Sequence, residues 1–149
     1  MILNLLKGMT KMNTTLNNSF DKNVKLITSL LSATNSNKIK WLVLSNELGS
    51  KIFNKNVEYE AYYSEINTNK IILSCKYYYD SFRGITEEDY AFSFLDNYDK
   101  VIYELAEKDF AYKGKALIEL FKMVKRKVAK IDEKIDQITD ILGEDINDF

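Results

Sequence analysis

Residues 57–79 read VEYEAYYSEINTNKIILSCKYYY, and this stretch decides the fold. On either side of the polar Asn67-Thr68-Asn69 segment the residues alternate with period two, the side-chain repeat of a β-strand. The alternation predicts a β-hairpin with one set of side chains facing the core. That set is Val57, Tyr59, Ala61 and Tyr63 on the first strand and Ile71, Leu73, Cys75, Tyr77 and Tyr79 on the second.

More strands are predicted on both sides of this hairpin. Residues 39–44 form an apolar first strand, in which Trp41 is expected to be buried against the first and last helices. Residues 80–89 are expected to be a loop, followed by a second hairpin that turns at residues 96–99. Because all the connections are short, an antiparallel meander is the economical topology.

Helical periodicity appears at both ends of the chain. Near the N-terminus, Ser19 is a candidate N-cap of a helix that ends in the polar segment 34–37. Near the C-terminus, apolar residues recur at alternating intervals of four and three, which predicts one helix over residues 115–142. These residues are Leu117, Phe121, Val124, Val128, Ile131, Ile135, Ile138 and Leu142.

The order of helix, sheet and helix predicts an α+β fold. We expect an antiparallel four- to five-stranded meander sheet, packed by an N-terminal helix and a long C-terminal heptad-patterned helix. A length of 149 residues fits one domain. We expect residues 1–18 to form a weakly ordered arm, and residues 19–149 to form a single α+β domain with an acidic C-terminal tail.

The composition argues against catalysis. The chain has no histidine and one cysteine, Cys75, so it lacks the commonest general base and any Cys-only zinc site. Carboxylates are paired at Glu58 and Glu60 and clustered at residues 87–89, but their spacing is typical of a solvated surface. We therefore expect a protein that is not an enzyme, with no cofactor and no metal. A lone thiol and the lack of a long apolar run favour the cytoplasm and argue against a membrane.

The second half of the heptad pattern indicates an oligomer interface. From Lys130 onward the apolar stripe narrows, which is more typical of a helix–helix seam than of a helix that covers a sheet. The candidate interface residues are Val128, Ile131, Ile135, Ile138 and Leu142. Basic residues precede acidic ones along this helix, so antiparallel pairing would place opposite charges side by side. A homo-oligomer, with a dimer favoured, is the expected assembly.

Cationic residues are the alternative candidates for a binding site. Arg83 lies in the predicted loop and would contact an anion, unless it forms a local ion pair with Glu87 or Glu88. The basic segment of the C-terminal helix would contact a ligand phosphate or nucleic acid through Lys122, Lys125, Arg126, Lys127 and Lys130. Tyr62 and Tyr78 fall on the strand faces opposite the expected core, and would form an exposed patch unless a second layer covers them.

These observations predict a non-enzymatic, oligomeric binding protein, such as a small inhibitor or regulator of a partner protein. The abundance of Asn, Lys and Ile is typical of low-GC bacteria, their phages and their mobile elements. One alternative is a protein that binds or sequesters a small ligand or nucleotide at a subunit interface. Another is a nucleic-acid binder that uses the basic helix segment, although a net charge of −1 disfavours it.

Overall fold

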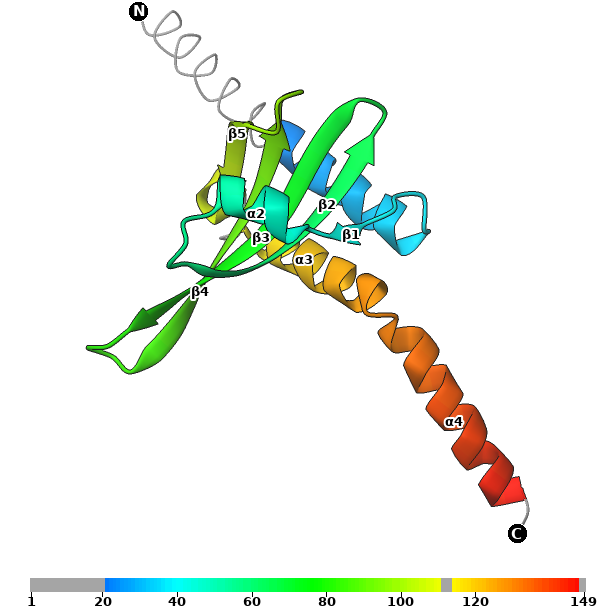
Figure 1. Ribbon diagram of the computed structural model, residues 1–149. Helices are drawn as coiled ribbons and strands as arrows, with labels where there is room; N and C mark the ends of the chain where they lie inside the picture. The colour runs from blue at the N-terminus through cyan, green and yellow to red at the C-terminus, as the bar shows by residue number, and fades with distance from the viewer. Residues whose placement is uncertain (1–20, 111–113, 148–149) are drawn as a thin grey trace, which may run out of the picture.

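The computed structural model describes residues 21–110 and 114–147. Its centre is a five-stranded antiparallel sheet in which the strands follow one another in sequence order (Figure 1). The strands are β1 (Leu42–Val43), β2 (Glu58–Ile66), β3 (Asn69–Asp80), β4 (Ile85–Leu95) and β5 (Val101–Ala106). The predicted meander is therefore confirmed.

Helices lie on both faces of this sheet. The first helix (residues 21–35) and α3 (Lys115–Val128) cover one face. The short helix α2 (Asn46–Ile52) lies on the other face (Figure 1). A 3-10 turn, η1 (Glu107–Asp109), follows β5, and α4 (Ile131–Asn147) ends the described chain. The α+β class is as predicted. The predicted arm over residues 1–18 and the Ser19 cap lie outside the described residues.

The hairpin of β3 and β4 is longer than the sequence pattern indicated. Strand pairing continues to Asp80 opposite Ile85, so the prediction of a loop over residues 80–89 is wrong. Alternation is hard to see there because the side chains of Thr86, Glu87, Glu88 and Asp89 are all polar and exposed. The outer part of this hairpin projects beyond the helices (Figure 1), so neither face needs apolar residues. We call residues 77–88 the hairpin arm.

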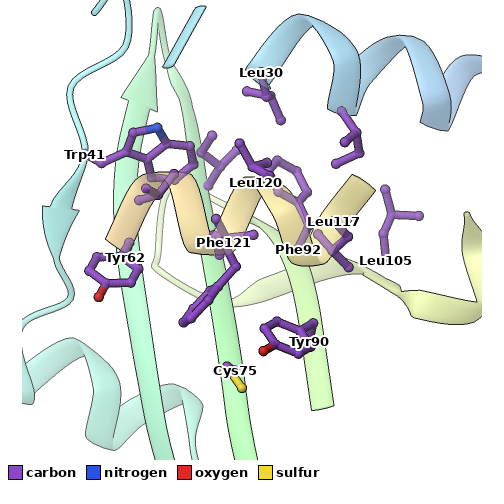
Figure 2. Packing of buried hydrophobic residues seen from close by; sticks show 14 of the residues in the cluster. Leu30, Trp41, Tyr62, Cys75, Tyr90, Phe92, Leu105, Leu117, Leu120 and Phe121 are labelled. Atoms are coloured by element: carbon purple, nitrogen blue, oxygen red, sulfur yellow. The ribbon is translucent and has the colours of Figure 1, made fainter. Parts of the chain in front are cut away.

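The main core lies between the sheet and the helix pair (Figure 2). Helix α3 contributes Leu117, Leu120, Phe121 and Val124, each at most 2% exposed. The ring of Phe121 packs 5.5 Å from that of Tyr62 and 5.3 Å from that of Tyr90. Trp41 is buried in this cluster as predicted, and its indole N–H donates to the Thr34 hydroxyl over 3.0 Å.

A second, smaller cluster lies under α2. It contains Ala61, Ile72 and Leu95 from the sheet, and Leu44, which follows β1. The Tyr59 ring stacks on Phe53 at 4.2 Å, and a Cβ on Gly49 would fall 2.0 Å from the Tyr59 hydroxyl, so glycine permits this close approach. The prediction placed Ala61 and Tyr59 in the main core and Tyr62 outside it. In the structure Tyr62 lies in the main core, and Tyr59 and Ala61 lie in the second cluster. The prediction was wrong because both faces of β2 are covered and a tyrosine side chain can be accommodated on either face.

The C-terminal helix is broken, whereas the sequence predicted one helix over residues 115–142. Helix α3 ends at Val128, and Lys130 adopts a left-handed conformation with φ of 55°. The Arg126 Nε donates to Asp132 Oδ1 over 2.8 Å and bridges the break. As a result α4 leaves the sheet and projects away from the body (Figure 1).

The buried Trp41–Thr34 hydrogen bond provides a stability test. Thr34→Val keeps the shape of the side chain but leaves the indole N–H without its acceptor. We expect a loss of about 1–3 kcal/mol in the free energy of unfolding, measured by urea denaturation. Thr28→Val, at an exposed position of the same helix, is the matched control and is expected to change stability by less than about 0.5 kcal/mol. Equal effects of the two substitutions would show that the hydrogen bond contributes nothing.

The left-handed residue at the break provides a second test. A non-glycine residue in this conformation is strained by about 1–2 kcal/mol, which glycine relieves. Lys130→Gly is therefore expected to leave stability unchanged or to raise it slightly. Lys122→Gly, within α3, is expected to lower it by about 1 kcal/mol. If urea denaturation showed the same loss for both variants, the helix would be continuous through residue 130.

Candidate functional site

Helix α4 carries a strip of exposed apolar side chains. We define the strip as Ile135, Ile138, Ile141 and Leu142, whose exposed fractions are 46%, 58%, 60% and 55%. Three of these residues belong to the predicted interface, and Ile141 extends it. The other two predicted residues lie at the junction with α3, where Ile131 is half-buried and Val128 packs against the main core.

Helix α4 is strongly acidic. Its sequence contains one lysine, Lys134, against six acidic residues. Asp132 and Glu133 in the first turn suit the positive end of the helix dipole. No basic residue lies in the last turn of α4 to complement the negative end of the helix dipole. The helix is thus a surface that combines apolar side chains with negative charge.

The basic segment belongs to α3 and the break, and most of its charges are already engaged. Lys125 forms an ion pair with Glu60 at 2.9 Å, and Arg126 pairs with Asp132. The Lys127 ammonium donates to the Asn35 carbonyl and to Asn37 Oδ1, 3.1 and 3.2 Å away. Two further cations of the segment, Lys122 and Lys130, are exposed. The predicted cationic site therefore has three of its five members bound to their own chain.

Glu60 is the centre of a small polar cluster on the face of the sheet that α3 covers. Burial raises its pKa, but hydrogen bonds from Lys125 and Tyr77 outweigh this effect and hold the pKa below its ordinary value. Burial and the bond to Glu60 raise the pKa of Tyr77. Burial also raises the pKa of the neighbouring Cys75 thiol, which favours the unreactive protonated form.

Arg83 lies in the turn between β3 and β4, at the tip of the hairpin arm. Figure 1 shows that this end of the hairpin projects away from α3. The guanidinium Nε donates to Asp80 Oδ2 over 2.8 Å, and a second nitrogen pairs with Glu87. Asp80 also accepts hydrogen bonds from the backbone N–H groups of Phe82 and Arg83. The local ion pair anticipated as the alternative for Arg83 is thus present, and it fixes a turn that leaves the Phe82 side chain fully exposed.

A hollow of about 550 Å³ lies where the first helix, the segment before β1 and the α3–α4 break meet. Ile39, Trp41 and Val128 give it apolar walls, and Lys40 and Lys127 give it positive charge. Asp132 and Glu133 from the first turn of α4 also line it. A second hollow of about 310 Å³, lined by Lys122, Met123 and Arg126, shares Lys127 and Asp132 with the first. We call the two together the junction groove.

Comparisons do not place the chain in a family. No protein-family model, no curated protein and no solved structure matches it. In the described ranges, no helix has both the length and the apolar character needed to cross a membrane. Across the same residues, no three acidic or cysteine side chains converge as the ligands of a metal ion would.

Sequence reasoning missed two parts of this surface. The junction groove joins Lys40 to Lys127, residues that are far apart in the chain and have no shared periodicity. The exposed arm tip was obscured because polar residues on both strand faces resemble a loop. The isolated Phe82 between polar neighbours is a signal that could have indicated an exposed aromatic side chain.

The Glu60–Lys125 pair predicts a specific pH dependence. The lowered pKa of Glu60 means that the stabilisation is present above its ordinary pKa of 4.5 and is lost as the pH falls further, through the lower pKa of the folded state. Glu60→Gln should therefore destabilise the protein at pH 6, by less than about 1 kcal/mol because the pair is partly exposed. The difference from wild type should shrink below pH 4.5.

Denaturation with urea across this pH range measures the effect. Glu58→Gln removes a neighbouring exposed carboxylate on the same strand and is the matched control. A difference between wild type and Glu60→Gln that stays constant from pH 6 to pH 3 would contradict the proposed role of the ion pair.

Proposed function

We propose that this chain is a non-enzymatic binding protein that associates through helix α4. The observation that carries the proposal is the exposed strip on a helix that projects from the body. Solvent-exposed apolar side chains in an unbroken row are unusual unless another surface covers them. Regulation or inhibition of a partner protein, by occupying part of its surface, is the kind of activity that such a module could perform.

The energetics are compatible with association. An isoleucine or leucine side chain stabilises a complex by about 1.5–3 kcal/mol when it becomes fully buried. The four strip residues are already about half-covered, so each can contribute roughly half that amount. Two such strips in contact would offset the lower estimates of the free energy lost on association, about 4 kcal/mol.

Binding of a phosphate-bearing ligand or nucleic acid has less support. Such binding depends on unpaired lysine and arginine side chains that can neutralise phosphates. Lys125, Arg126 and Lys127 already bind groups of their own chain. Arg83 is likewise paired with two carboxylates. A ligand at these positions would have to displace existing contacts.

Self-association through the strip is testable by sedimentation equilibrium at micromolar concentration. Wild type is expected to dimerise, and Ile135→Asp to be a folded monomer, because a buried unpaired carboxylate is strongly unfavourable. Gln137→Asp adds the same charge on the opposite side of α4 and is expected to remain a dimer. Circular dichroism of each variant checks that it is folded. A wild-type protein that stays monomeric would contradict self-association.

A further inference from the structure

The break between α3 and α4 lies in a stretch of sequence that favours an unbroken helix. Residues 115–142 contain no glycine or proline, the residues that most often interrupt a helix. Ala129 and Lys130, which lie between the two helices, are both good helix formers. The alternating apolar intervals of four and three residues also continue across the break, from Val128 to Ile131. The sequence therefore favours one helix where the structure has two.

The backbone at the break is strained. Lys130 has a φ of 55°, in the left-handed region that disfavours residues other than glycine. The break also removes backbone hydrogen bonds. In one continuous helix the N–H groups of residues 131–133 would donate to the carbonyl groups of residues 127–129, whereas the first N–H groups of a separate helix lack such partners. Both costs disappear when the helix is continuous.

Contacts of the first turn of α4 hold the bent form. Arg126 pairs with Asp132 across the break, and both side chains are more than half exposed. Residues six apart in one helix lie roughly 9 Å apart along its axis and about 120° apart around it, so this ion pair exists only in the bent form. Ile131 is half-buried, and Glu133 lines the same hollow as Trp41. These contacts offset the strain at Lys130.

We propose that the α3–α4 break is a conformational switch, in which the bent form interconverts with a form that has one helix over residues 115–147. The opposing contributions are of similar size. Strain at Lys130 and lost backbone hydrogen bonds favour the straight form, and an exposed ion pair and a half-buried side chain favour the bent one. Such a balance leaves both forms populated.

The switch sets the direction in which the strip faces. Val124 and Leu142 are 18 residues apart, which is five full turns, so in the straight form they face the same way. Because Val124 is buried in the main core, the straight form turns the strip toward the sheet side of the molecule. In the bent form α4 projects away from the body (Figure 1). Regulation of association by this change of direction rests on the proposed function, whereas the switch itself does not.

The distance between two spin labels distinguishes the forms. Glu119→Cys and Gln137→Cys, both at exposed positions, place the labels 18 residues apart. In one straight helix the labels lie on the same face, roughly 27 Å apart. The bent form has its own angle and rotation between α3 and α4 and gives a different distance. Ile135→Asp is included so that the protein is monomeric, and the buried Cys75 is not expected to react with the label.

Two substitutions of Lys130 are expected to shift the equilibrium in opposite directions. Glycine and valine are both poorer helix formers than lysine. Glycine accepts the left-handed conformation, which the β-branched side chain of valine opposes. Lys130→Gly is expected to lower the ratio of straight to bent form at least about fivefold, and Lys130→Val to raise it about threefold. A wild-type distance that equals that of Lys130→Gly and is unchanged in Lys130→Val would overturn the switch.

The ion pair across the break provides an independent test. Arg126→Gln removes a contact that only the bent form makes, and is expected to raise the ratio of straight to bent form by up to about fivefold. Raised salt should have the same effect on protein that retains Arg126 and little effect on Arg126→Gln. Lys122→Gln removes a charge from an exposed position of α3 and is the matched control. Equal ratios in the two variants would overturn the role of the ion pair in the switch.

The outcomes separate this inference from the proposed function. Sedimentation of wild type reports association, whereas the label distance is measured on a monomer. Two label distances, in a chain whose wild type does not dimerise, would support the switch and contradict self-association. A single distance that Lys130→Val leaves unchanged, in a chain whose wild type does dimerise, would overturn the switch and support association through α4.

Discussion

The burial of α3 against one face of the sheet is the contact on which the rest of the structure depends. Leu117, Leu120, Phe121 and Val124 form a stripe that is at most 2% exposed, and each such side chain stabilises the fold by about 1.5–3 kcal/mol. The sheet covers this helix for its 14 residues. The apolar pattern continues in α4, beyond the sheet, where the strip residues are 46–60% exposed in the part of the chain that the structure describes.

The layout of the sheet was largely predictable from residue periodicity. Alternation predicted the hairpin turn near Asn67, because one buried face forces a period of two. The same alternation assigned the side chains of β2 to the wrong faces of the sheet. Helix α2 covers the second face, and Tyr59 and Tyr62 are equally suited to either one. Helix α2 was missed because it is seven residues long and contributes only Leu48 and Ile52 to the second cluster. So short a segment has little periodicity to detect.

The apolar strip was predictable and its surroundings were not. Narrowing of the stripe after Lys130 identified the exposed positions, since a helix that covers a sheet needs a wider apolar face. The break at Lys130 carries no glycine or proline, so no local signal marks it. The groove depends on contacts between residues such as Lys40 and Val128, which only the folded chain brings together.

The break at Lys130 also determines the direction in which α4 projects. Its direction is set by one residue in a left-handed conformation and by the Arg126–Asp132 ion pair on the surface. With 17 residues, α4 is about 25 Å long. A change of about 10° at its base would therefore move its far end by about 4 Å, roughly the rise of three residues. Small changes in backbone torsion at a single lysine thus translate into large displacements of the helix end.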